Sequence, residues 1–195
     1  DKLDKRCSIV MGSGMRKRFP DIDESFGGIV FLGYHAYDTS EATLAHVYSS
    51  ATFQYQKING KDVGEMQVDA LIAGRYGVPP IFCAGDNYCV AQAKESFDGI
   101  VTVETKKALA WNSCISKHPI KCCEEIYEGV KKAAAEADKM KPYTVGEPFE
   151  YEVRYKRIEY AQGCTYRDIN NNLFERTDAY TRKGLIMKPE HIFEF

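Results

Sequence analysis

The fold is constrained most by an unbroken run of four large apolar residues, from Ile29 to Leu32, which Gly27 and Gly28 precede. Such a run indicates a strand that is buried on both faces, and strands of this kind are typical of parallel sheets covered by helices. Ligands of open α/β sheets collect at the carboxyl ends of the strands. His35 follows this strand, and histidine is both the commonest metal ligand and a frequent general base. The run therefore predicts an α/β fold with His35 at its functional edge.

Two further side chains complete a candidate site with His35. His46 follows eleven residues later and opens a segment, Val47 to Ile58, in which apolar and polar residues alternate. This alternation predicts a strand with His46 at its mouth, and the next pair, Asn59-Gly60, is a strong hairpin turn signal. Glu65 lies just after that hairpin. Two imidazoles and a carboxylate, with no thiolate, suit zinc or a similar divalent ion that acts on water.

These residues also have plainer interpretations. His35 can be an ordinary histidine at the end of a strand. Asp62 and Glu65 have the spacing of a capping box, in which Glu65 reaches back to the start of its helix. Farther along the chain, Ser113 and Cys114 invite interpretation as nucleophiles, but the sequence places no obvious base beside them.

The rest of the chain alternates between helix and strand patterns, which predicts an α/β fold with a mostly parallel sheet and helices on both faces. The predicted elements are a helix at 63–76, a strand at 81–84, a helix at 88–97, a strand at 100–104 and a long helix from Pro119 to about Met140. Asp86 follows the strand at 81–84, and we expect it to be the N-cap of the next helix. The last third favours a strand at 149–155, a helix at 158–165, and strand or helix at 179–186 and 189–195. We expect an α/β domain at 1–145 that carries the candidate metal site, and a smaller C-terminal α+β segment at 146–195 that can belong to the same domain.

Composition narrows the classes of function. The 26 basic and 28 acidic residues give a net charge of −2 and form no block of like charge, which argues against nucleic acid as a partner. No apolar run is long enough to cross a bilayer, so we expect no membrane partner. Seven cysteines without a Cys-x-x-Cys pair indicate reduced thiols and a cytoplasmic protein. The Gly12-Ser13-Gly14 triplet can cradle an anion, although glycine is more often a turn former.

Several segments in order resemble one known family. They are Phe31 to Ala36, His46 eleven residues after His35, the Asn59-Gly60 hairpin, Val63-Gly64-Glu65 with its helix, and Pro79 to Asp86. Together these segments resemble the zinc-dependent D-aminopeptidases of the DppA type, peptidase family M55. The likeness is clear from about Phe26 to Val103, fairly good to Met140 and faint afterwards.

The resemblance implies a metallo-aminopeptidase that hydrolyses short peptides with an N-terminal D-amino acid, such as D-alanine, through a water activated by two zinc ions. It implies that His35 and Glu65 are zinc ligands, that His46 stands beside the metals as a catalytic residue, and that the subunits form a ring-like homo-oligomer.

The chain departs from this family at both ends. The family begins with a strand that carries an Asp-x-Glu pair, followed by a further histidine ligand, and residues 1–28 contain neither. The C-terminal helix expected after Phe195 is also missing from the sequence. The chain therefore looks like an incomplete copy of a longer one, lacking its N-terminal part. The alternative is a non-catalytic assembly or small-ligand-binding subunit of the same fold that lacks part of the metal site.

Overall fold

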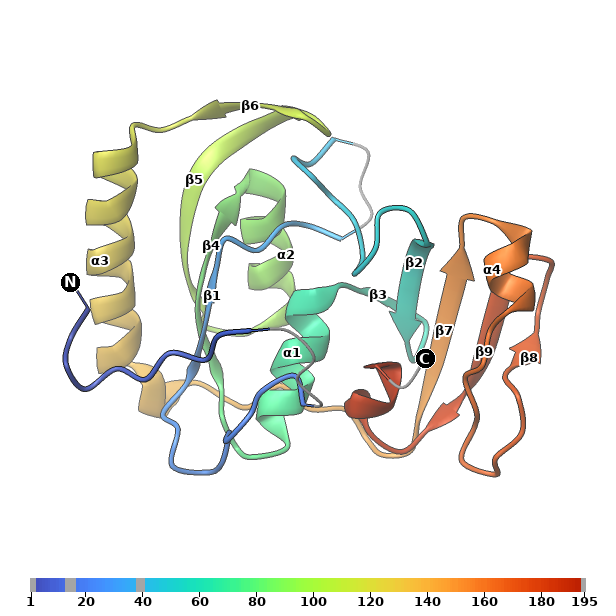
Figure 1. Ribbon diagram of the computed structural model, residues 1–195. Helices are drawn as coiled ribbons and strands as arrows, with labels where there is room; N and C mark the ends of the chain where they lie inside the picture. The colour runs from blue at the N-terminus through green and yellow to red at the C-terminus, as the bar shows by residue number, and fades with distance from the viewer. Residues whose placement is uncertain (1–2, 13–16, 38–40, 194–195) are drawn as a thin grey trace.

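The computed structural model describes residues 3–12, 17–37 and 41–193, which form two sheets with helices around them (Figure 1). The first sheet has the strand order β1-β4-β5-β6 and the second has the order β3-β2-β7-β9-β8. The strands of the first sheet are β1 (Ile29–Leu32), β4 (Pro80–Asp86), β5 (Val101–Ala110) and β6 (Ser113–Ser116). Those of the second are β2 (Phe53–Ile58), β3 (Lys61–Val63), β7 (Phe149–Tyr155), β8 (Glu175–Arg176) and β9 (Thr181–Ile186). The helices are α1 (Glu65–Gly74), α2 (Asn87–Ser96), α3 (Pro119–Ala135) and α4 (Ile158–Gln162), with 3₁₀ turns η1 (Ala137–Lys139) and η2 (Pro189–Phe193).

The first sheet is built around β4, which is buried along its whole length. β1 and β5 pair with β4 in parallel, and β6 pairs with β5 in the antiparallel sense. Helices α1 and α2 pack on one face around Phe31, whereas α3 packs on the other face over Phe82 and Val103. The predicted α/β fold, a mostly parallel sheet with helices on both faces, is confirmed. Because the parallel strands share one direction, the carboxyl ends of β1 and β4 meet at one edge.

The prediction that β1 is buried on both faces is wrong. Among the described residues β1 pairs with β4 alone, so it is an edge strand, and Val30 and Leu32 are 39% and 60% exposed. Phe31 points to the face that α1 and α2 cover and is fully buried. On the opposite face of the sheet α3 packs over β4 and β5, and its apolar cluster includes no residue of β1. An apolar run can therefore occur in a strand that is covered on one face only.

The second sheet is antiparallel and takes strands from both halves of the chain. β2 and β3 form the hairpin predicted at Asn59-Gly60, where both residues have positive φ, and β7 pairs with β2. β7 coincides with the strand predicted at 149–155, and every second residue in it is buried. Because β2 and β7 are neighbours, the segments 1–145 and 146–195 share one sheet, and their division into domains stays a prediction.

The strand predicted to begin at Val47 begins at Phe53 instead. Leu44 and Tyr48 have φ values of 57° and 47°, in the left-handed region, which interrupts extended pairing before the strand can start. His46 therefore lies in a loop between β1 and β2, and not at the mouth of a strand. Alternation of apolar and polar residues does not distinguish a strand from such a loop.

The start of α1 corrects a second expectation. Gly64 is the N-cap, and the side chain of Gln67 accepts a hydrogen bond of 3.0 Å from the backbone N–H of Gly64. The prediction of a capping box between Asp62 and Glu65 is therefore wrong, because Gln67 takes the position that Glu65 would have filled. Glu65 becomes the first residue of the helix, and its carboxylate is available for other contacts.

The other helix starts agree with the sequence. Asp86 caps α2 by accepting a hydrogen bond of 2.8 Å from the N–H of Cys89, and Pro119 opens α3. The predicted helix at 158–165 is α4, and the segment at 189–195 begins with η2. Strands β6 and β8 had no sequence signal. No helix of the described residues combines the length and apolar character needed to span a bilayer.

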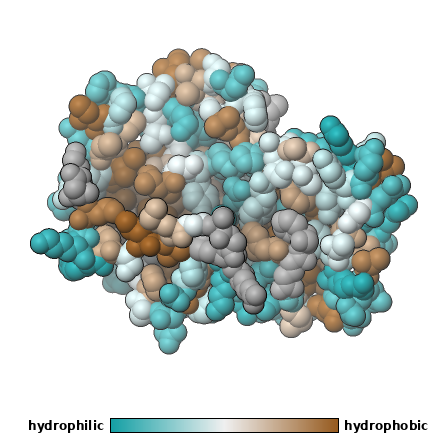
Figure 2. Space-filling model, viewed as in Figure 1, coloured by the Kyte–Doolittle hydropathy of each residue, from teal (hydrophilic) through white to brown (hydrophobic). Residues whose placement is uncertain are grey.

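Apolar side chains also remain on the surface. Ile9, Val10 and Met11 are each at least 60% exposed. Figure 2 shows an apolar band on this face, along the course that the first described residues take in Figure 1. Most of the Gly12-Ser13-Gly14 triplet lies outside the described residues, so its anion-binding interpretation has no structural counterpart.

Candidate metal centre

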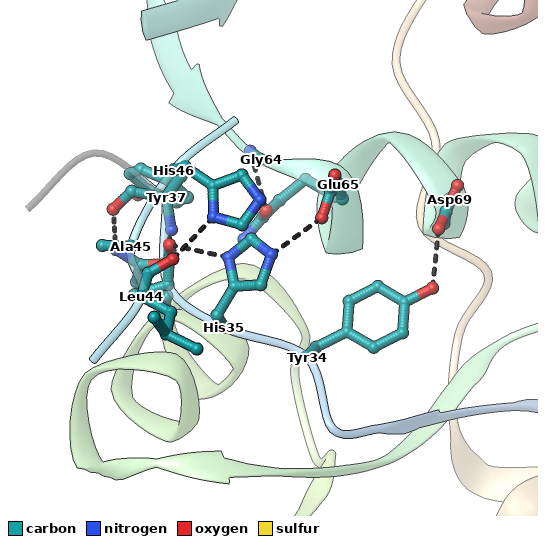
Figure 3. Close-up of polar contacts among 12 residues, drawn as sticks. Tyr34, His35, Tyr37, Leu44, Ala45, His46, Gly64, Glu65 and Asp69 are labelled. Atoms are coloured by element: carbon teal, nitrogen blue, oxygen red, sulfur yellow. Dashed lines mark hydrogen bonds and ion pairs between the residues drawn. The ribbon is translucent and has the colours of Figure 1, made fainter. Parts of the chain in front are cut away.

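His35 and Glu65 meet at the carboxyl edge of the first sheet. His35 follows β1, Glu65 opens α1, and the Nε2 atom of His35 lies 3.0 Å from the Oε2 atom of Glu65 (Figure 3). Both side chains are about one-fifth exposed, so solvent reaches the pair from one side. The close approach expected from the sequence is present, although 30 residues separate the two in the chain. Parallel pairing of β1 with β4, and packing of α1 on Phe31, bring them together.

His46 completes the group from its loop. Its ring stacks on that of His35 with centroids 3.9 Å apart and planes inclined by 20°. One potential ligand atom from each of His35, His46 and Glu65 lies within 4.8 Å of the other two, the one such group of at least three residues in the described part of the chain. The structure thus brings together all three residues that the sequence singled out.

Backbone carbonyls determine which ring nitrogen of His35 and of His46 faces the other residues of the site. The Nδ1 atom of His46 lies 2.6 Å from the carbonyl oxygen of Leu44, and that of His35 lies 3.2 Å from the oxygen of Ala36. A carbonyl accepts but cannot donate, so we assign the proton of each neutral ring to Nδ1. Nε2 of each histidine then carries the lone pair that can bind a metal or accept a proton.

The electrostatics of His35 and Glu65 are coupled. Partial burial alone lowers the pKa of His35, but its hydrogen bonds to Glu65 and to the carbonyl of Ala36 outweigh this effect and raise the pKa. For Glu65, burial alone raises the pKa, whereas the hydrogen bond and charge of His35 outweigh it and lower the pKa. The pair thus favours an imidazolium beside a carboxylate when no cation is bound between them.

A zinc ion fits this donor set. With Nδ1 of His35 protonated, the Nε2 lone pair points at a carboxylate oxygen, an arrangement that requires either a proton or a cation between the two atoms. Two ligands at about 2.0 to 2.1 Å from zinc lie about 3.3 Å apart at tetrahedral angles, close to the 3.0 Å observed. Ligating histidines also typically donate their other N–H to a carbonyl, as His35 does to Ala36.

A buried network beside the site was not predicted. Asp69 lies one helical turn after Glu65, its side chain is fully buried, and it forms two hydrogen bonds of 2.8 Å with Arg18. The hydroxyl of Tyr34 donates to the same carboxylate at 2.7 Å (Figure 3). Burial raises the pKa of both Tyr34 and Asp69, and the positive charge of Arg18 beside the Asp69 carboxylate offsets only part of this effect. The network connects the residue before His35 to the helix of Glu65.

A sequence signal for this network existed. Asp69 interrupts an otherwise apolar stretch of α1, and a charged residue in such a stretch needs a partner if it is buried. The partner, Arg18, is 51 residues away and could not be named from the sequence.

The other predicted residues do not join the group. Asp86 is the N-cap of α2 and also accepts a hydrogen bond of 2.8 Å from the backbone of Thr43, which attaches the loop of His46 to the end of β4. Ser113 and Cys114 are exposed on the edge strand β6. All seven cysteines are free thiols.

Fold and site together define an α/β protein with a candidate metal centre at the carboxyl edge of its parallel sheet. The chain belongs to the D-aminopeptidase family of peptidases, M55, which it matches over residues 1–187. The resemblance noted from the sequence is thereby confirmed, and the family supports a peptide hydrolase.

Two known proteins are similar to this chain. A D-aminopeptidase of Bacillus subtilis (strain 168) is 30% identical over 123 residues, which make up 63% of this chain and 44% of that protein. The zinc-dependent D-aminopeptidase DppA from Bacillus subtilis, a self-compartmentalizing protease, has the same fold, with a TM-score of 0.87 and 22% identity. That match covers 99% of this chain and 69% of the solved one. The chain thus spans less than half the length of the curated relative that it matches.

Proposed function

We propose that this chain carries the catalytic centre of an aminopeptidase that removes an N-terminal D-amino acid, such as D-alanine, from short peptides. His35 and Glu65 hold zinc, and His46 acts on the substrate. The convergence of these three side chains within 4.8 Å supports the proposal most directly, because they come from a strand end, a loop and a helix start. Membership of the D-aminopeptidase family supports the type of reaction.

Zinc at this position would polarise the peptide carbonyl and lower the pKa of a bound water toward neutrality. The chain's own residues divide the remaining work. His35 and Glu65 are the fixed ligands, since His35 lies three residues after β1 and Glu65 is the first residue of α1. His46 presents Nε2, the nitrogen without a proton in our assignment, so it can take the proton released on attack and return it to the leaving amine.

The resemblance to the family implies two zinc ions. The described residues offer one cluster of three donors, so a second ion would need ligands from elsewhere in the protein.

We also propose that the subunits assemble into a ring-like homo-oligomer, which the description of DppA as self-compartmentalizing supports. We propose a cytoplasmic site of action, which the seven free thiols support.

The test uses the natural full-length protein, purified with zinc, and four substrates: D-alanyl-D-alanine, its L,L isomer, the N-acetylated D,D peptide and D-alanine amide. We expect release of D-alanine from the D,D peptide and from the amide, and none from the acetylated peptide, because an aminopeptidase requires the free amine. Dialysis against a chelator should abolish the reaction and added zinc should restore it. Stoichiometric zinc without hydrolysis of any substrate, or no zinc at all, would favour the non-catalytic subunit instead.

A further inference from the structure

The loop that carries His46 has an unfavourable backbone. His46 lies midway between Leu44 and Tyr48, two residues other than glycine with φ values of 57° and 47°. Left-handed conformations disfavour such residues, and a loop that contains two of them persists only where its surroundings hold it. The position of His46 therefore depends on contacts from outside the loop.

Trp111 supplies two of these contacts. It lies in the turn between β5 and β6, where its indole N–H donates to the carbonyl of Ala45 at 2.9 Å and its own carbonyl accepts from the N–H of Leu44 at 2.6 Å. The Leu44 carbonyl in turn accepts from Nδ1 of His46 at 2.6 Å. Trp111 thus contacts the backbone of both residues that precede His46.

The indole bond acts on the peptide unit that joins Ala45 to His46. The oxygen of this unit accepts from Trp111, and its N–H donates to the carbonyl of Ala36 at 3.3 Å. The same Ala36 oxygen accepts from Nδ1 of His35. Because a peptide unit is planar, bonds at its two ends fix its orientation, and with it the direction of the His46 side chain.

Burial does not account for Trp111 at this position. The residue is 46% exposed, and it belongs to none of the apolar clusters of the described residues. A tryptophan that contributes little to a core, and still forms two hydrogen bonds with one loop, has a role in that loop.

We propose that Trp111 is a positioning residue for His46, which it holds beside His35 through the carbonyl of Ala45. The proposal rests on the proposed catalytic role of His46. Loss of the indole bond releases one end of the Ala45–His46 peptide unit and leaves the zinc ligands His35 and Glu65 in place. Turnover then falls about tenfold, because a catalytic group that samples several orientations is in its productive geometry for a smaller fraction of the time.

The test replaces Trp111 in the full-length protein with benzothienylalanine, in which sulfur takes the place of the indole N–H and the ring keeps its shape. We expect kcat for a D-alanyl peptide to fall about tenfold, while KM and bound zinc stay at the parent values. Deuterium exchange of residues 42–48 should rise, with residues 80–86 of β4 as the internal reference. Because the ring keeps its shape and belongs to none of the apolar clusters of the described residues, this variant should fold.

Two controls separate the hydrogen bond from general damage to the hairpin. 5-Fluorotryptophan at position 111 keeps the N–H and should behave as the parent. Ile115→Ala removes an apolar side chain that is 62% exposed on β6 and should leave kcat and exchange unchanged.

Three results would overturn the proposal: unchanged kcat and unchanged exchange in the benzothienyl variant, loss of zinc together with kcat, or an equal loss with fluorotryptophan. If the parent protein itself hydrolyses no D-alanyl peptide, the proposed function fails. The exchange of residues 42–48 then still decides whether the indole bond holds the loop.

Discussion

The two sides of the candidate metal centre are held in different ways. Glu65 is the first residue of α1, and His35 lies three residues after β1, so the positions of both follow from sheet pairing and helix packing. His46 stands in an irregular loop whose conformation depends on individual hydrogen bonds: Trp111 forms two with the loop, and Ala36 and Asp86 accept one each from its backbone N–H groups. A metal ligand must stay fixed, whereas a group that works on the substrate must reach it, and the two kinds of support suit these roles.

The largest expected effect concerns His35 and Glu65, which we call the fixed side of the metal centre. His35→Ala and Glu65→Ala should each remove zinc and activity together, because the remaining donors cannot hold the ion at the concentration of free zinc in a purified sample. The measurement is metal content by mass spectrometry beside the rate on D-alanyl-D-alanine. Asp62→Ala is the matched control: this carboxylate lies three residues before Glu65, is half exposed and pairs weakly with Lys57 at 3.9 Å. If the His35→Ala and Glu65→Ala variants both keep the zinc content of the parent protein, these residues are not ligands.

The second effect concerns His46 and its loop, which we call the loop side of the metal centre. His46→Ala should keep most of the zinc and the oligomeric state of the parent, and should lose 100-fold or more in turnover, as is typical for removal of a proton-transfer group. The comparison needs rates and metal content from the same preparation. His118→Ala is the control, because His118 caps α3 outside the metal centre. If zinc is lost with His46, the loop supplies a ligand and the contrast between the two sides disappears.

The sequence predicted the fixed side better than the loop side. The apolar run of β1, the hairpin at Asn59-Gly60 and the helix predicted at 63–76, which the structure begins at Glu65, placed His35 and Glu65 correctly relative to the sheet. The same kind of pattern gave the wrong environment for His46, since residues 47–52 alternate like a strand and yet form turns. Alternation records which residues are apolar, and it carries no information about left-handed φ values at Leu44 and Tyr48.

The burial of β1 and the partner of Asp69 could not be predicted for a related reason. Exposure of Val30 and Leu32 depends on whether a further element covers β1, and the pairing of Asp69 depends on where Arg18 lies. Both are contacts between segments far apart in the chain, and no local pattern records them.

A third prediction tests whether the buried ion pair supports the fixed side. Asp69→Asn should lower the free energy of unfolding by about 3 kcal/mol, because it leaves the guanidinium of Arg18 without its buried counter-charge. Denaturant unfolding at constant zinc measures the change. The double variant Asp69→Leu with Arg18→Met removes both charges and should recover part of the loss. A cost below 1 kcal/mol would show that solvent around Arg18, whose side chain is 38% exposed, already compensates the pair.

The smallest effect concerns Tyr34, which precedes His35 and donates its hydroxyl to Asp69 at 2.7 Å. Tyr34→Phe removes this hydrogen bond and keeps the ring that packs on Phe31. A hydrogen bond to a charged group contributes about 1.5 to 3 kcal/mol. Because the bond joins the end of β1 to α1, part of its loss should appear as a looser separation of His35 and Glu65, and we expect zinc to bind about tenfold more weakly.

Competition with a chromophoric chelator measures the zinc affinity of the Tyr34→Phe variant. With zinc at saturation the variant should turn over at the parent rate, since His46 and its loop are untouched. Tyr55→Phe is the matched control, because Tyr55 also donates its hydroxyl to a carboxylate, Glu152 at 3.0 Å, but does so in the second sheet. A fall in kcat at saturating zinc would mean that Tyr34 acts on both sides of the centre, and that the fixed ligands and the loop of His46 are mechanically coupled through β1.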